Sequence, residues 1–212
     1  MVSNDVEALE VGDSCEALLL TPKARIIAPL RVLHRGDADF LLLTEPELGE
    51  RVASELTRMR FAAKCEIVPE EHESWLVLGG GEVIDTRPEG EEATEEEAER
   101  ARIEAGVPRW GHDLDERVLP AEAGLDTTHI SFTKGCYPGQ EPIARLHHRG
   151  HVNRRLRVLE VENASPGDEI AHDGKPVGRI TSAVPGVALG YVRVEVPDDA
   201  QLSVGGETAR LH

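Results

Sequence analysis

The segment with the most chemical potential holds a single cysteine between turn-forming residues. Residues 134–141 read KGCYPGQE, so Cys136 stands beside Lys134 and shortly before a helix that we expect to begin near Gln140 and Glu141. A neighbouring ammonium group and a helix N-terminus both favour the thiolate form of a cysteine. The two glycines and the proline imply a tight backbone path into that helix. A reactive or ligand-facing thiol is one interpretation, and a small packed side chain is the other.

Positive charge is concentrated around this segment, although the chain as a whole is acidic. The chain has 40 Asp and Glu against 23 Lys and Arg, a net charge of −17, which disfavours nonspecific attraction to DNA or anionic lipid. Between Lys134 and Arg157, however, six basic residues face one acid, Glu141. This local inversion suits an anionic ligand or a narrow contact with RNA phosphates. Alternatively, these arginines pair with the acidic middle of the chain, residues 66–122.

Other residues that could bind a metal or react give weaker signals. His147 and His151 are four residues apart, but Gly150 is expected to break the helix between them, so no metal site is predicted. Cys15 and Cys65 lie in or beside expected strands, where we expect them to be packed. The three cysteines form no CxxC pair, which indicates neither a disulfide framework nor a zinc ribbon.

The first half of the chain predicts an α+β fold, with antiparallel sheets that carry helices on one face. Apolar residues recur at helical spacing from Pro46 to about Arg60, and Thr44 with Glu47 matches a capping box. The glycines at 79–81 lack the residues of a phosphate loop and indicate a hairpin turn. Strands are expected at residues 16–20, 26–33, 40–43, 65–68 and 75–78.

The second half begins with an acidic stretch and ends in short alternating strands. Thr94 and Glu97 match a second capping box, and Gly106 is placed to end that helix. The later strands predict a small antiparallel β-barrel or sandwich and are expected at residues 156–161, 168–171, 177–182, 188–194, 202–204 and 208–211. We therefore expect α+β lobes in residues 1–112, a connecting segment with the KGCYPGQE motif in 113–150, and a C-terminal β-barrel in 151–212.

The amino terminus, MVSNDVEALE, has neither the basic start nor the apolar stretch of a secretory signal. No later run approaches the roughly 20 apolar residues of a membrane span. These features predict a cytoplasmic protein.

The KGCYPGQE segment resembles the KGCYxGQE signature of the YgfZ-type folate-binding proteins. RIEAGVP at residues 102–108 and LTPKARI at 20–26 resemble two further stretches of that family, the second with Ala24 where glycine is usual. GRITS at 178–182 and ALGY at 188–191 resemble the C-terminal barrel that the family shares with the aminomethyltransferase (T-protein) of glycine cleavage.

The resemblance implies two α+β lobes and a barrel arranged as a ring around a folate pocket, with tetrahydrofolate or a one-carbon derivative as cofactor. It implies a role in assembling or maintaining iron-sulfur clusters and in tRNA modification that depends on such enzymes. The expected partners are the folate and an iron-sulfur client protein, with tRNA contact possible at residues 134–157 and neither DNA nor membrane binding. Cys136 is the expected key thiol, with Lys134 and Tyr137 beside it. The expected folate-binding residues are Arg102, Glu104, Gly135, Gly139, Gln140, Glu141, Arg145 and Arg149.

Two departures from the family pattern carry further expectations. Where the aminomethyltransferases have an acidic pair, one Asp of which serves the folate amine, this chain has Ala28 and Pro29, so aminomethyl transfer in glycine cleavage is not expected. Residues 3–6, SNDV, resemble a motif that normally lies tens of residues into the chain. We therefore expect the first strand and helix of the first lobe to be missing, and either a second copy to cover an exposed apolar face or the lobe to be less stable.

Two other classes of function remain open at this point. One is a folate-dependent one-carbon transferase or demethylase that acts on a small amine, for which Asp5 is the nearest acidic candidate. The other is a noncatalytic adaptor that uses the basic stretch to contact tRNA or a client protein. In that case binding should weaken steeply with salt.

Overall fold

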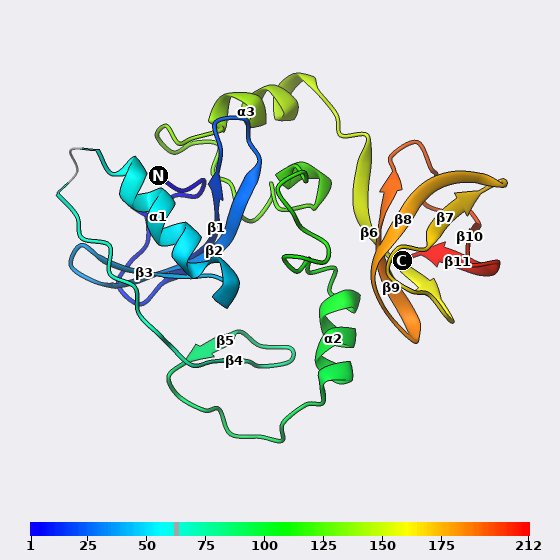
Figure 1. The fold of residues 1–212 in the computed structure, drawn as a ribbon, viewed down its shortest axis with the longest axis horizontal. Helices are drawn as coiled ribbons and strands as arrows, with labels where there is room; N and C mark the ends of the chain where they lie inside the picture. Colours follow the sequence, from blue (N-terminus) through cyan, green and yellow to red (C-terminus); the bar gives the residue numbers. More distant parts are fainter. Residues whose placement is uncertain (62–63) are drawn as a thin grey trace. The chain divides into compact units, whose positions relative to one another are not determined.

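The computed structural model describes residues 1–61 and 64–212. The chain forms two compact units (Figure 1). The first comprises Met1–Ile67, Arg109–Leu156 and Arg193–Glu195, and the second comprises Val68–Pro108, Arg157–Val192 and Val196–His212. Residues that are distant in sequence therefore share a core in each unit.

The first unit contains a three-stranded antiparallel meander of β1 (Ser14–Leu20), β2 (Ile26–Gly36) and β3 (Asp39–Leu43) in the order β1-β2-β3. This confirms the three predicted strands. Ala17 and Leu19 of β1 belong to the same buried cluster as Leu30 and Val32 of β2. The alternating apolar residues thus give the sheet one face on which a helix can pack.

Helix α1 (Gly49–Met59) lies on the sheet and follows a single 3-10 turn at Pro46–Leu48 (Figure 1). Val52 and Leu56 lie in the core cluster of the sheet, as their helical spacing predicts. The predicted capping box at Thr44 is wrong. The Thr44 hydroxyl donates to the Pro29 carbonyl at 2.9 Å, because a tertiary partner on β2 competes for it. The N-cap residue of the 3-10 turn is Glu45 instead, and its side chain makes no capping bond within the described chain.

The expectation of an exposed apolar face on the meander is also wrong. Residues 17–20 of β1 are each at most 1% exposed. In the described parts of the chain, the large hydrophobic side chains that are exposed all lie outside β1, β2 and β3. Both faces of β1 are therefore covered within the chain.

Residues 65–68 form no strand, in contrast to the prediction, and Val68 is 65% exposed. The next strands, β4 (Ser74–Leu76) and β5 (Glu82–Ile84), pair with each other in a two-stranded sheet. A segment without a neighbouring strand cannot satisfy its backbone groups in a ladder. The glycines at 79–81 lie in the turn that joins β4 to β5, as predicted.

Helix α2 (Glu95–Glu104) begins with the predicted capping box and ends where the sequence indicates. The Thr94 hydroxyl accepts from the Glu97 amide, and the Glu97 carboxylate accepts from the Thr94 amide at 2.8 Å. Gly106 follows the helix with a left-handed φ of 67°, which glycine adopts at little cost.

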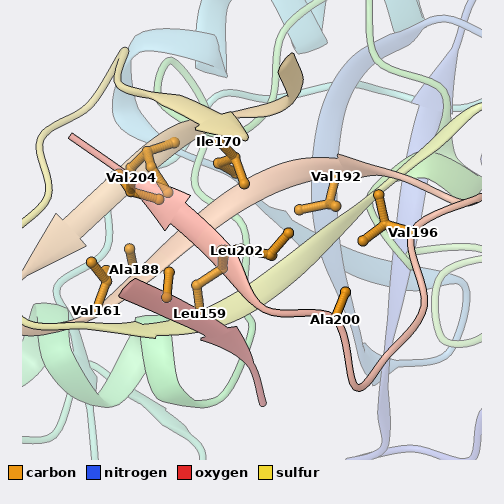
Figure 2. Close-up of a cluster of buried hydrophobic side chains, with 11 residues drawn as sticks. Leu159, Val161, Ile170, Ala188, Val192, Val196, Ala200, Leu202 and Val204 are labelled. Carbon is orange, nitrogen blue, oxygen red and sulfur yellow. The ribbon is translucent and has the colours of Figure 1, made fainter. Parts of the chain in front are cut away.

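The second unit is built on a closed barrel, as predicted, with strand order β10-β11-β6-β9-β8-β7. Its core consists of branched and small aliphatic side chains that point inward, among them Leu159, Ile170 and Leu202 (Figure 2). Closure leaves no free sheet edge. The strands are β6 (Arg154–Val161), β7 (Glu169–His172), β8 (Lys175–Val184), β9 (Gly186–Arg193), β10 (Leu202–Val204) and β11 (Glu207–Leu211).

The remainder of the first unit is largely irregular between Arg109 and Gly139, apart from a 3-10 turn at Pro120–Glu122. It ends in helix α3 (Gln140–Arg149), which begins and ends where predicted, with Gly150 as its C-cap. In the described part of the chain, no helix is long and apolar enough to cross a bilayer.

Candidate functional site

Cys136 is exposed and lies in a loop without regular structure, immediately before α3. We call residues 134–139 the motif loop. The other two cysteines are free thiols as well. Cys15 packs at the edge of the sheet core, as expected, whereas Cys65 is exposed, so the prediction of a packed Cys65 is wrong. The segment around Cys65 forms no strand that could bury it.

Lys134 ties the motif loop to the amino-terminal segment. Its ammonium group donates to the carbonyl oxygens of Val2 at 3.0 Å and Asn4 at 2.8 Å. The same nitrogen lies 5.9 Å from the centre of the Tyr137 ring. Lys134 thus has a structural role, since its charge-assisted hydrogen bonds go to main-chain oxygens.

Tyr137 anchors the loop by burial. The residue is 7% exposed, and burial raises the pKa of its phenol. Its hydroxyl oxygen is buried and has no hydrogen-bond partner in the described residues. While the side chain of Tyr137 points inward, the preceding Cys136 remains at the surface.

Gly139 fixes the end of the loop against the β1–β2 hairpin. Its φ is 85°, and a Cβ atom built on it would lie 2.7 Å from the Thr21 carbonyl oxygen and 3.1 Å from the Ala24 Cα. Figure 1 shows α3 beside the tip of this hairpin. Only glycine permits both this conformation and this approach, so the loop and the hairpin are held in one arrangement.

The amino-terminal segment is fastened to the same region. The fully buried Ser3 accepts from the Leu18 amide at 2.8 Å and donates to the His129 carbonyl at 2.6 Å. The Asn4 side chain donates to the carbonyl oxygens of Glu16 and Thr128. Burial lowers the pKa of His129 to about 4, so its ring is neutral at physiological pH. Residues 2–4 therefore bridge β1 to the segment that leads into the motif loop.

A pocket of about 490 Å³ lies beside α3 within the first unit. Its apolar wall includes Ile130, Phe132, Ile143, Leu146 and Val152. Three arginines also line it, namely Arg145, Arg149 and Arg155, which we call the cationic rim. The volume lies in the range typical of small-molecule sites.

The three arginines of the cationic rim differ in their partners. Arg145 pairs with Glu141 at 2.8 Å, and both side chains are largely exposed. The side chains of Arg149 and Arg155 make no ion pair or hydrogen bond within residues 1–61 and 64–212. The structure thus brings the predicted pair Arg145 and Arg149 together and adds Arg155.

The remaining arginines of the basic stretch are paired. Arg154 bonds Glu122 at 3.2 Å, and Arg157 bonds Asp198 at 2.8 Å. Pairing with acidic residues therefore accounts for part of the stretch, and one of these acids, Glu122, lies in the acidic middle of the chain. It does not account for Arg149 and Arg155.

The other predicted folate residues divide between the units. Arg102 and Glu104 lie on α2 in the second unit, where Arg102 bonds Glu99 at 2.7 Å. Gln140 is half-buried at the start of α3, and Gly135 is exposed. The motif residues therefore lie in the same unit as Arg145 and Arg149, whereas α2 belongs to the other unit.

The histidines near α3 form an aromatic group. The rings of His147 and Phe132 stack with centroids 4.1 Å apart, and His147 meets His148 edge-on. Within the described parts of the chain, no three His, Cys, Asp or Glu side chains are grouped as metal ligands. Phe132 was not singled out from the sequence, because one aromatic residue in a loop carries no pattern.

Comparisons with known proteins agree with this architecture. Residues 153–212 match the family model described as CAF17, C-terminal beta-barrel domain. The chain is 33% identical over 108 residues to the mitochondrial iron-sulfur cluster assembly factor IBA57 of Mus musculus, covering 50% of this chain and 29% of that protein. It is 36% identical over 193 residues to an aminomethyltransferase of Nostoc sp., covering 90% of this chain and 43% of that protein.

The crystal structure of the glycine cleavage system aminomethyltransferase T from Bartonella henselae matches all of this chain and 78% of that chain. The TM-score is 0.79 and the identity 17%. The molecule therefore has the aminomethyltransferase-like α+β fold with a closed C-terminal β-barrel. Together with the KGCYPGQE segment, these matches support a relationship of the chain to the YgfZ-type folate-binding proteins. The matched stretches span less than half the length of the mouse and Nostoc proteins.

Proposed function

We propose that this protein binds a reduced folate and supports the assembly or repair of iron-sulfur clusters, with Cys136 as its working thiol. Support comes from the likeness to a protein named as an iron-sulfur cluster assembly factor and from the folate-related transferase fold. Through such clusters, the proposed role extends to the enzymes that modify tRNA.

The observation that carries this proposal is the exposed thiol on a firmly held loop. Lys134, Tyr137 and Gly139 fix the backbone around Cys136, while the thiol itself remains accessible. A thiolate presented in this way can bind an iron atom of a client cluster after its proton passes to solvent, and it can leave again by ligand exchange. That step requires neither an oxidant nor a reductant.

The proposed folate contacts follow from charge. The tail of folate carries carboxylates, and a guanidinium group can bind a carboxylate through two hydrogen bonds. Arg145 and Arg149 lie together at the pocket beside α3 and are the proposed tail partners. Arg102 and Glu104 of α2 are the proposed residues for the pterin ring.

Two measurements test this function. Calorimetric titration with tetrahydrofolate under anaerobic conditions should show binding, and no heat at several hundred micromolar ligand would refute the folate claim. In a strain that lacks the endogenous protein, a Cys136→Ser variant should fail to restore the activity of an iron-sulfur enzyme. Cys65→Ser is the matched control, because Cys65 is also an exposed free thiol but lies outside the motif loop. Full rescue by Cys136→Ser would remove the thiol from the mechanism.

A folate-dependent one-carbon transferase is the second candidate, favoured by the match to the Nostoc aminomethyltransferase over 90% of this chain. The residues at the position of the aminomethyltransferases' acidic pair argue against it. Ala28 is fully buried in β2 opposite Leu19, and Pro29 lies opposite Leu18, so neither position supplies a carboxylate. Release of a one-carbon unit from methylene-tetrahydrofolate with a small amine as acceptor would favour the transferase.

We further propose that the protein works in the cytoplasm and that its partners are an iron-sulfur client and, through residues 134–157, tRNA. The mouse relative is named as mitochondrial, so fractionation of the source cells is the direct test of location. The basic side chains of this stretch are the proposed phosphate contacts. A tRNA affinity that does not weaken with salt would contradict this contact.

A further inference from the structure

We propose that the pocket beside α3 binds an aromatic ring that carries carboxylates, the p-aminobenzoylglutamate half of a folate, and that Arg149, Arg155 and Phe132 recognise it. The inference rests on the proposed folate binding and deepens it, because it states which half of the ligand this pocket takes. It also adds two recognition residues, Arg155 and Phe132, to those expected from the sequence.

Unpaired positive charge is the first reason. Arg149 and Arg155 both line the pocket, and neither has an acidic partner within the described parts of the chain. By contrast, the adjacent Arg154 bonds Glu122. Successive side chains of a strand point to opposite sides. Arg154 therefore bonds Glu122, while the guanidinium group of Arg155 remains available to a ligand. Two available guanidinium groups match the two carboxylates of a single glutamate.

The shape and polarity of the pocket are the second reason. Ile143 and Leu146 of α3 form part of its wall. Phe132 also lines the pocket, and 38% of its surface is exposed. Phe132 is stacked on His147, which holds the ring in place and leaves surface for a ligand. An exposed aromatic ring next to aliphatic side chains is suited to the benzoyl ring of a ligand.

The excess of hydrogen-bond donors among the charged side chains of the pocket favours the benzoylglutamate half of folate over the pterin half. A pterin has one ring carbonyl oxygen that accepts, but it also presents an amino group and ring N–H groups, which need acceptors. The pocket lining has three arginines, which only donate, against one described carboxylate, Asp126. Carboxylates only accept and therefore complement these arginines. A ligand of the opposite polarity would leave the guanidinium groups without partners.

Calorimetry with ligand fragments tests the inference. The ligands are tetrahydrofolate, p-aminobenzoylglutamate, tetrahydrobiopterin as a tail-less pterin, and AMP as another aromatic ring with an anionic group. We expect p-aminobenzoylglutamate to bind the wild-type protein and AMP to bind at least tenfold more weakly. Replacing both Arg149 and Arg155 by alanine should weaken p-aminobenzoylglutamate and tetrahydrofolate by at least about tenfold, since charged hydrogen bonds are lost. The binding of tetrahydrobiopterin should stay unchanged.

Two single variants complete the test. Phe132→Ala should weaken p-aminobenzoylglutamate severalfold. Arg58→Ala is the matched control, because it removes one exposed positive charge on α1, outside the pocket, and should leave every affinity unchanged. Thermal melting of each variant shows whether it is folded, and all the replaced side chains are exposed.

The outcomes separate this inference from the proposed function. If tetrahydrofolate binds but the double arginine variant binds it as tightly as the wild type, the pocket assignment is wrong and the folate claim stands. If p-aminobenzoylglutamate binds in an arginine-dependent way while tetrahydrofolate does not, the folate claim fails and the pocket assignment stands. Equal binding of AMP and p-aminobenzoylglutamate would overturn the selection of a carboxylate ligand.

Discussion

Before the start of α3, the side chain of Lys134 in the motif loop bonds to the main chain, whereas the side chains of Arg149 at the end of α3 and Arg155 on β6 make no polar contact that the structure describes. Lys134 is bonded to two carbonyl oxygens, and Gly139 packs against the β1–β2 hairpin. Arg149 and Arg155 stand at a pocket without an acidic partner among the described residues. The motif loop before α3 is therefore held by internal contacts, whereas the two arginines at the pocket beside α3 have side chains that remain available to a ligand.

This difference predicts how substitutions divide. Changes in the motif loop that remove or obstruct one of its contacts should lower the free energy of unfolding, since these contacts exist in the unliganded protein. Changes in the cationic rim should lower ligand affinity and leave stability within about 0.5 kcal/mol, as surface substitutions usually do. Each prediction below tests one side of this contrast.

The largest effect is expected from Gly139→Ala. The added Cβ would lie 2.7 Å from the Thr21 carbonyl oxygen, and alanine is strained at a φ of 85°. Strain and overpacking together should cost at least about 3 kcal/mol in the free energy of unfolding, measured by urea denaturation. Gly135→Ala is the matched control, because its Cβ would meet no described atom within 4 Å. If the two variants are equally stable, the hairpin does not hold the loop.

A smaller loss is expected from Lys134→Met. The variant keeps the length of the aliphatic chain but removes both hydrogen bonds to Val2 and Asn4, so unfolding should become easier by roughly 1.5–3 kcal/mol. Lys64→Met, at an exposed position, should have almost no effect. If Lys134→Met unfolds with the same urea midpoint as the wild type, the amino-terminal segment is held by other contacts.

The fold was predictable where local sequence decides structure. The meander, the capping box at Thr94, the ends of α3 and the barrel strands follow from apolar alternation and from capping residues and glycines, which act on near neighbours. The prediction failed at Thr44, because its hydroxyl bonds the carbonyl of Pro29 on another strand. It failed again at residues 65–68, which have no partner strand. Both failures depend on long-range contacts that a local pattern does not contain.

The candidate site was predictable to a similar extent. The sequence singled out Cys136, Arg145 and Arg149 but could not separate Arg155 from Arg154. On a strand, adjacent residues must face opposite ways, and only the packing decides which of the two meets an acid. Ala24 shows the same limit. The sequence marks it as a departure from the usual glycine, and only the structure shows why glycine is usual there: the residue has a left-handed φ of 58°.

The next effect concerns pH and the anchoring of the amino-terminal segment. Burial lowers the pKa of His129 to about 4 from 6.5, so the unfolded chain binds a proton more readily than the folded chain between these values. This contribution to stability is complete above about pH 6.5 and is lost as the pH falls toward 4. It amounts to roughly 1–3 kcal/mol, reduced by the Glu16 carboxylate 3.8 Å from the ring.

His129→Gln tests this contribution, because glutamine does not titrate. The wild type should lose more stability than the variant between pH 6.5 and 4, measured as urea midpoints at several pH values. The comparison of the two proteins removes the background from other carboxylates. Parallel pH profiles would show that His129 does not resist protonation in the folded state.

The smallest effect is expected from Tyr137→Phe. The Tyr137 hydroxyl oxygen is buried without a described hydrogen-bond partner, so its removal deletes a desolvated polar group and keeps the ring. The variant should be as stable as the wild type or more stable by up to about 1 kcal/mol, in contrast to Lys134→Met in the same loop. A loss of more than about 1 kcal/mol would mean that the hydroxyl is bonded to solvent inside the fold. The loop would then be anchored by Tyr137 through a polar contact as well as through burial.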